Sequence, residues 1–481
     1  MSDKNNAGTV WIRKHTRRRL SAVLAVVIAC AATLEFGVGV AAADPTAPPV
    51  PVQPVLPFPI PPVPPELDPG FYSPAPEVVA SKQPGEIIAA REVHLAFYSI
   101  VPFNIDAWQL SYRSTNTRDE PIAAVTTVMK PRGDNAGRPR NLLSYQFSED
   151  SNAQYCSPSY ALQQASIPGF YTTQYVIPYE FILPISALGA GWAVAMPDHE
   201  GPRSAFGDGP LGARIAMDGM RAAENFVPMG LSRETEIGAA GYSGGALPTG
   251  HLAEMHASYA PELNIVGVAE GGNLPDLRAA MELANGNLAS GLIAGGILGI
   301  AREEPEFDAF IQQHINPVAR AVIPVKNALC WSSAAILPFL NTKGLFDVPN
   351  LYDQPRVAAV LERMRQGHST PDMPVFIYHS NPDWVAPVGP VNQLVQQYCA
   401  DPNARVQYVR DNFSEHLSLQ IAGMARVLLW LKDRFDGVPV PNGCTVHDEG
   451  AMNLDPATWP EWLRGAGDLL AGLLQQPIGT R

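Results

Sequence analysis

The chain has 481 residues, of which 46% are hydrophobic and 16% charged, with 33 basic against 46 acidic side chains. The formal charge of −13 argues against nucleic acid as a partner, because that binding depends on Lys and Arg neutralising phosphates. The length suffices for one large domain with an insertion or for two domains, and does not choose between them.

Residues 1–43 have the pattern of a secretory signal peptide. A basic segment, 13–19, precedes an apolar stretch, 20–32, and three alanines at 41–43 provide a small-residue cleavage site. The apolar stretch is short for a transmembrane helix, and Glu35 interrupts its continuation. We therefore predict a secreted protein cleaved after Ala43, whose mature chain has 27 basic and 44 acidic residues. Lipidation at Cys30 and a twin-arginine signal are variants of this leader that stay open.

Four cysteines remain after cleavage, and an even number in an exported chain predicts two disulfides. Their spacing is too wide for a Cys-x-x-Cys zinc or redox site, so we expect no metal. The residues alone permit three pairings of Cys156, Cys330, Cys399 and Cys444.

Residues 44–76 contain 14 prolines in 33 positions and almost no charge before Glu66. Because proline disrupts helices and interior strands, we predict a semi-rigid polyproline II linker here. Such a linker would hold a catalytic domain away from a cell envelope, or it is a tolerated leader without a role.

Strand-like runs follow the linker in two groups. The first group, 87–93, 107–112 and 122–129, is punctuated by Asn, Asp and Pro and predicts opening antiparallel strands. The second group is almost wholly apolar and alternates with helix-compatible sequence, as buried parallel strands do. Its members are 142–147, 193–196, 237–241, 265–269, 375–378 and 406–409. The alternation predicts an α/β fold with a doubly wound, mostly parallel central sheet.

Residues 274–365 interrupt this alternation with helix-compatible stretches and no convincing strand, so we predict an inserted helical lid or cap. Within it, 291–300 is apolar and glycine-rich, which suits either a mobile cover over an apolar pocket or an ordinary buried helix. The core would then comprise 77–273 and 366–445, including a helix at 417–435. Residues 446–481 would form a C-terminal tail with an amphipathic helix at 459–474.

The pentapeptide 241–245 matches the pattern Gly-x-Ser-x-Gly, with a strand-like run before it and a helical stretch after it. In that context a sharp turn holds Ser243 in a strained conformation above the sheet, and glycines on either side let strand and helix approach. The pattern predicts Ser243 as the nucleophile of an acyl-transfer reaction.

A serine nucleophile needs a histidine base and an acid, which follow two late strands in this type of fold. Asp383 lies in the loop after 375–378, and His416 lies in the loop after 406–409, so we assign them as acid and base. Glu415 is the main alternative acid. The other histidines and acids weighed and disfavoured by their positions are His251, His256, His379, His447, Asp372 and Asp401.

An oxyanion needs two backbone donors, one after the nucleophile and one from the loop after an early strand. Gly244 supplies the first. The run 142–147 ends in a polar loop, so Asp150 is the candidate for the second and Ser151 is its alternative.

Taken together, these motifs resemble the secretory lipase family of fungi and actinobacteria, from about residue 71 to residue 444. The resemblance rests on Asp150 with Cys156-Ser-Pro-Ser-Tyr160, Gly191-Trp-Ala-Val-Ala-Met-Pro-Asp-His-Glu-Gly201, the pentapeptide 241–245, Tyr378-His-Ser-Asn-Pro-Asp383 and Ser414-Glu-His416. It implies an α/β-hydrolase fold with a lid inserted before the acid strand, and cofactor-free hydrolysis of triacylglycerols or other lipid esters. It also implies the disulfides Cys156–Cys330 and Cys399–Cys444.

Two residues of the acid loop depart from the family pattern, Ser380 in place of glycine and Ala386 in place of valine. The spacing from Asp150 to Cys156 also differs by a residue. The favoured hypothesis is a secreted lipase or esterase acting on lipid esters, with a lipid-water interface as a possible setting. The alternatives are an acyltransferase that uses an envelope sugar or alcohol as acceptor and a non-catalytic exported binding protein.

Overall fold

The computed structural model describes residues 61–132, 139–330 and 338–479. The chain divides into two units, 1–44 and 45–481, and all described residues belong to the second. The predicted signal peptide and the linker up to residue 60 lie outside the described residues.

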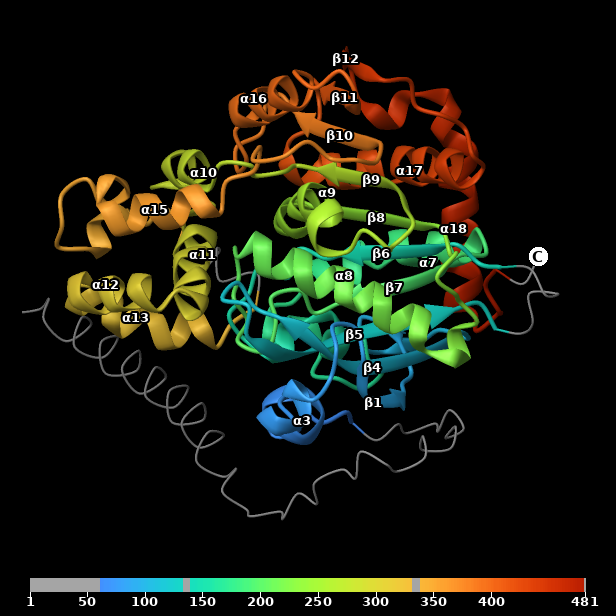
Figure 1. Ribbon diagram of the computed structural model, residues 1–481, viewed down its shortest axis with the longest axis horizontal. Coiled ribbons are helices and arrows are strands. Elements are labelled where there is room, and N and C mark those ends of the chain that lie inside the picture. The colour runs from blue at the N-terminus through green and yellow to red at the C-terminus, as the bar shows by residue number, and fades with distance from the viewer. Residues whose placement is uncertain (1–60, 133–138, 331–337, 480–481) are drawn as a thin grey trace, which may run out of the picture. The chain divides into compact units, whose positions relative to one another are not determined.

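A ten-stranded sheet forms the centre of the described part of the chain (Figure 1), in the order β1-β4-β5-β7-β6-β8-β9-β10-β11-β12. Strands β1, β4, β5 and β7 pair antiparallel, and β7, β6 and β8 to β12 pair parallel. The strands are β1 (Ile87–Glu92), β4 (Asp106–Thr115), β5 (Pro121–Lys130), β6 (Leu142–Gln146), β7 (Ala193–Pro197), β8 (Ile237–Tyr242), β9 (Ile265–Gly271), β10 (Val375–Ser380), β11 (Arg405–Asp411) and β12 (Gly443–Glu449). The predicted α/β fold and its strands are confirmed, and β12 was missed.

Helices cover both faces of the sheet and enclose two apolar cores. On one face, α8 (Gly209–Asn225), α9 (Ala246–Tyr259) and α16 (Val388–Tyr398) bury apolar side chains against the strands. On the other face, α7 (Ile182–Gly189) and α17 (His416–Phe435) do the same. Burial of both faces explains why the central strands are almost wholly apolar in sequence.

The end of the predicted polyproline linker is helical instead of extended. Short helices η1 (Pro65–Leu67), α2 (Pro69–Tyr72) and α3 (Pro76–Ala80) each begin with a proline. Proline is compatible with the first turn of a helix, where the missing N–H has no partner to lose. Phe71 and Tyr72 are buried against Val125 of the sheet, so this part of the linker packs on the core.

Helices between β9 and β10 are grouped to one side of the sheet, at the left of Figure 1, and we call this group the cap. It comprises α10 (Leu277–Ala284), α11 (Ser290–Glu303), α12 (Pro305–His314), α13 (Pro317–Asn327) and α15 (Pro355–Arg363). The cap has its own apolar core, to which Ile297 and Ile300 of α11 belong together with Phe307 and other side chains. The glycine-rich run 291–300 therefore belongs to a packed helix.

The sheet extends past the predicted end of the core at residue 445, because β12 continues it to Glu449. Sequence patterning missed β12 because most of its side chains are exposed at the sheet edge, with no apolar alternation. Beyond it, α18 (Trp459–Leu473) packs against α7 and α17. Within the described residues, no helix has the length and apolar character needed to cross a bilayer.

Smaller elements connect these layers. They are β2 (Ala96–Phe97), β3 (Val101–Pro102), α4 (Pro158–Ala161), α5 (Gly169–Thr172) and α6 (Val176–Glu180). The two disulfides implied by the family resemblance are present: Cys156 bonds Cys330, and Cys399 bonds Cys444. The first bond joins the segment after the Asp150 loop to the cap, across a sequence separation of 174 residues.

Candidate active site

Ser243 occupies the sharp turn between β8 and α9, at the carboxyl edge of the parallel strands. Its φ of +51° lies in the left-handed region, which is strained for a side chain other than glycine. A Cβ at Gly241 would overlap the carbonyl of Gly245, and a Cβ at Gly245 would overlap that of Gln146. The glycines of the pentapeptide therefore allow a close approach that holds Ser243 at the turn.

The structure brings Ser243, His416 and Asp383 into contact, although 173 residues separate the first two along the chain. The Nε2 of His416 lies 2.7 Å from the Ser243 Oγ, and its Nδ1 lies 2.6 Å from the Asp383 Oδ2. Because a carboxylate only accepts, the Nδ1–H of His416 donates to Asp383. The Nε2 lone pair is thereby directed at the serine hydroxyl, which is the arrangement that activates a serine nucleophile.

The acid loop fixes the carboxylate of Asp383 with backbone donors. The N–H groups of Val385 and Ala386 donate to its Oδ1 at 2.8 and 2.7 Å. Burial acts to raise the pKa of Asp383, but the hydrogen bond and charge of His416, with His379 and the Ala386 N–H, outweigh it and lower the pKa. Asp383 is therefore held as the anion that a histidine partner requires.

Both departures from the family pattern take part in this geometry. Ala386 supplies one of the two N–H groups that bind Asp383. Ser380 donates its hydroxyl to the carbonyl of Ser414, which joins the acid loop to the loop before His416.

The competing residues are engaged elsewhere. Glu415 caps α17 by accepting from the N–H groups of Leu417 and Ser418, and it accepts from the Trp384 indole. His256 pairs with Asp372, whereas His251 contacts the carbonyl of Met364. Exposed His447 contacts Glu449 on β12, and Asp401 accepts from the N–H of Asn403 in a turn.

Asp150 lies directly beside Gly244, as a Cβ built on Gly244 would overlap the Asp150 carboxylate. Both residues line the same pocket as Ser243. Asp150 has a φ of +46° and is buried, so the loop after β6 places it in a constrained conformation. Ser151, the alternative donor, instead gives its N–H to Glu200 at 3.3 Å.

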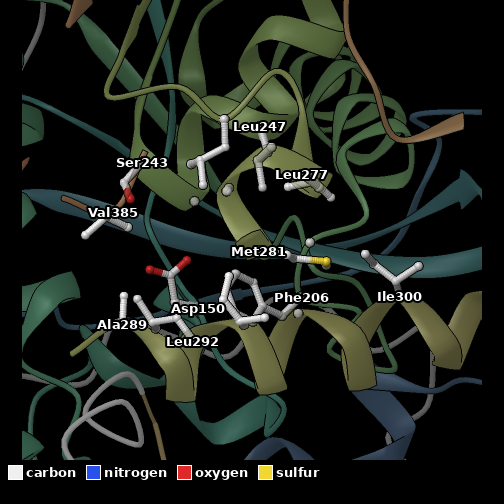
Figure 2. A pocket seen from close by; sticks show the side chains of 16 residues that line it. Asp150, Phe206, Ser243, Leu247, Leu277, Met281, Ala289, Leu292, Ile300 and Val385 are labelled. Carbon is white, nitrogen blue, oxygen red and sulfur yellow. The ribbon is translucent and has the colours of Figure 1, made fainter. Parts of the chain in front are cut away.

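An apolar pocket of about 540 Å³ extends from Ser243 beneath the cap. Figure 2 shows Ser243 and Asp150 toward one end and Ile300 at the other, with Met281 and Phe206 between them. Helix α11 forms one wall through Leu292, Gly296 and Ile300. Its almost wholly apolar lining suits a hydrocarbon chain.

A second pocket of about 750 Å³ opens from Ser243 on the His416 side. It shares Asp150, Ala289, Leu292 and Val385 with the first pocket. The remaining lining is mixed, with Trp384, Leu417 and Gln420 among its members. Ser243 therefore stands where two pockets meet.

Two buried residues stand behind the site: Glu180, which the sequence did not indicate, and His379, which its position in the sequence disfavoured as a base. Glu180 of α6 accepts from the Ser148 N–H at 3.2 Å and from Gln420 at 2.5 Å, between the loop after β6 and helix α17. Burial raises the pKa of Glu180 to about 8, although its hydrogen bonds oppose the shift. His379 of β10 lies beside Asp383, with 3.8 Å between its Nε2 and the Asp383 Oδ2. Glu180 belongs to no motif, and for His379, which lies in the motif 378–383, the sequence indicated its place before the acid but not its contact with Ala386.

The fold is close to that of a solved lipase. The structure of Candida antarctica lipase A matches with a TM-score of 0.76 and 28% identity, over 86% of this chain and 98% of that chain. Fold and site together define the class of protein as an α/β-hydrolase, a lipase or carboxylic ester hydrolase.

Family comparisons identify the branch of that class. The family model described as secretory lipase matches residues 169–443. A secreted triacylglycerol lipase of Malassezia globosa is 32% identical over 427 residues, covering 86% of this chain and 91% of that protein. A protein of Mycobacterium tuberculosis named a probable inactive lipase is 36% identical over 379 residues, covering 78% and 83%. The chain belongs to the secretory lipase family.

Proposed function

We propose that this protein is a secreted serine hydrolase that cleaves lipid esters, triacylglycerols among them, through an acyl-enzyme on Ser243. The observation that carries the proposal is the continuous contact from Asp383 through His416 to the Ser243 hydroxyl. Membership of a family whose relatives include a secreted triacylglycerol lipase supports the substrate class and export.

In the first half of the reaction, Ser243 Oγ attacks the ester carbonyl carbon while His416 Nε2 takes its proton. The oxyanion accepts from the backbone N–H groups of Gly244 and Asp150, two residues that line the same pocket as the serine. Asp383 stabilises the imidazolium that forms. His416 then gives the proton to the leaving alcohol, and a water molecule repeats the sequence to release the acid.

The two pockets give the substrate a direction. The first pocket begins at Gly244 and Asp150, where the carbonyl oxygen would lie, and its apolar depth takes the acyl chain. The second pocket contains His416, which must reach the leaving oxygen, so it takes the alcohol portion. Leu288 and Leu417 line this second pocket and are about half exposed, which favours contact with a lipid-water interface.

The existence of a relative named as inactive makes the catalytic geometry of this chain the deciding feature. Here the nucleophile, base and acid are all present, and their hydrogen-bonding atoms lie 2.6 to 2.7 Å apart. We therefore propose that this member is active.

Substitution of the nucleophile tests the proposal. Ser243→Ala should lower the hydrolysis of a p-nitrophenyl ester by at least about 10⁴-fold, the scale of loss when a triad member is removed. Thermal unfolding should show that the variant remains folded. Wild-type rates in a folded Ser243→Ala protein would refute the mechanism.

A further inference from the structure

His379 is the last residue but one of β10, and its imidazole is fully buried beside the acid loop. Its Nε2 lies 3.0 Å from the carbonyl oxygen of Ala386 and 3.8 Å from the Asp383 Oδ2. The ring therefore bridges the beginning of the loop, where the strand ends, and the far side of the loop, where the chain turns toward α16.

The protonation of this imidazole follows from its contacts. A carbonyl oxygen only accepts, so the Nε2 of His379 carries hydrogen and donates to Ala386. Its Nδ1 is buried and has no hydrogen-bond partner among the described residues, which fits an unprotonated nitrogen. Burial lowers the pKa of His379 and outweighs the opposing charge of Asp383, so the ring is neutral at ordinary pH.

The Ala386 peptide segment is held on both sides of the residue. Its carbonyl accepts from His379, while its N–H donates to the Asp383 Oδ1 at 2.7 Å. With Oδ1 fixed by the backbone, Oδ2 is directed at the Nδ1 of His416. Movement of the Ala386 segment would therefore rotate or withdraw the carboxylate from the base.

We propose that His379 is a positioning residue of the hydrolytic reaction, which acts through Ala386 to aim the Asp383 carboxylate at His416. This inference rests on the proposed function of the site. His379 does not touch the reacting atoms, because its hydrogen-bonding nitrogen faces the acid loop.

A matched pair of variants separates the hydrogen bond from the packing. His379→Gln retains an N–H donor on a side chain of suitable reach, and His379→Met has a similar length and shape without a donor. We expect His379→Met to lower kcat about 10- to 100-fold with KM within threefold, because a small misplacement of a catalytic group costs rate and not ground-state binding. His379→Gln should recover kcat to within fivefold of wild type.

A double-mutant cycle tests whether His379 acts through Asp383. In an Asp383→Asn background, adding His379→Met should change kcat less than twofold, since the carboxylate it positions is gone. The low-field proton resonance of the His416 Nδ1–H should weaken or move upfield in His379→Met and stay in place in His379→Gln. If His379→Met does not fold, His379→Phe replaces it as the variant without a donor.

Three results would overturn the inference: unchanged kcat in the variant without a donor, equal losses in the Gln and Met variants, or the full loss again in the Asp383→Asn background. Failure of the proposed function is distinguishable, because wild-type activity would then be independent of Ser243. In that case Ser243→Ala and wild type would hydrolyse the ester at the same rate.

Discussion

Gly244 carries one of the two N–H groups proposed to bind the oxyanion, and the residue that carries the other, Asp150, packs directly against it. The absence of a side chain at Gly244 is what leaves room for the Asp150 carboxylate. The spacing of the two donors therefore depends on a contact between two loops that are 94 residues apart in the sequence.

Gly244→Ala should displace Asp150 and lower kcat about 100- to 1000-fold, the range for loss of one oxyanion donor. Asp150→Ala removes the carboxylate that the new Cβ would overlap but keeps the backbone N–H. We expect the double variant Gly244→Ala/Asp150→Ala to be more active than Gly244→Ala alone, measured as kcat on a soluble ester. If Gly244→Ala keeps more than half of the wild-type kcat, the two donors are not set by this contact.

The sequence predicted Ser243, Asp383 and His416 because each follows a strand in the order that this fold requires. It did not indicate the positioning role proposed for His379 or the buried contacts of Glu180, which join residues across a loop or far apart in the chain. Such roles depend on side-chain packing that no local pattern encodes.

Among the elements, α11 both lines the first pocket, which is proposed to take the acyl chain, and is tied to the loop after β6. The guanidinium of Arg302 donates to the carbonyls of Asn152 and Ser204, and the Asn152 side chain donates to the carbonyl of Gly295. Glu303 pairs with Arg203 at 2.6 Å. These contacts make α11 a wall of the described site that is coupled to the loop carrying Asp150.

Substitution on α11 should change chain-length preference. Gly296 lines the pocket, and a Cβ there would have only Phe206 within 4 Å, so a larger side chain would project into open space. Gly296→Leu should lower kcat/KM for esters of long acids at least tenfold. For acetyl and butyryl esters, kcat/KM should stay within threefold of the wild-type value. Gly467→Leu, at a helix glycine of α18 with open space around it, is the matched control. Equal losses for short and long esters would place the acyl chain elsewhere.

The elements were predictable to different degrees, for physical reasons. Parallel strands such as β8 are buried on both faces, so their sequences are continuous apolar runs from which the strands can be predicted. Edge strand β12 lacks such a run, and helix α2 begins at a proline within a segment whose composition favours polyproline II. In both cases the structure depends on contacts with the rest of the domain.

At the scale of the whole molecule, several carboxyl groups are buried and have raised pKa values. Burial is the largest cause in each case, and it raises the pKa to about 8 for Glu180 and Glu270 and to about 7 for Asp198 and Asp208. These groups bind protons more tightly in the folded chain than in the unfolded chain, where carboxyl pKa values are about 4. Their contribution to stability is full below pH 4 and is lost as the pH rises to between 7 and 8.

Buried histidines have the opposite effect on the pH dependence of stability, and they have it at lower pH. Burial lowers the pKa of His199 and His251 to about 4, so stability falls as the pH drops from about 6.5 toward 4. Above pH 6.5 these histidines are neutral in both the folded and the unfolded chain. Of the buried groups named here, only the carboxyl groups still titrate there.

We therefore expect the free energy of unfolding to decrease from pH 6.5 to pH 8.5. Denaturant titration at each pH measures it. Glu180→Gln removes one of the titrating groups and should make this decrease shallower. Glu77→Gln, at an exposed glutamate of α3, should reproduce the wild-type slope. If the free energy of unfolding of the wild type does not change between pH 6.5 and pH 8.5, or if it decreases equally in Glu180→Gln and wild type, the proposed titration of the buried carboxyl groups is contradicted.

The most direct test of the central claim, that His416 activates Ser243, is labelling by a fluorophosphonate followed by peptide mass spectrometry. We predict a single adduct on Ser243 that forms in wild type, is absent in Ser243→Ala and forms at least about 100-fold more slowly in His416→Phe. No adduct on Ser243 in the folded wild-type protein, or the same labelling rate in His416→Phe, would contradict the account.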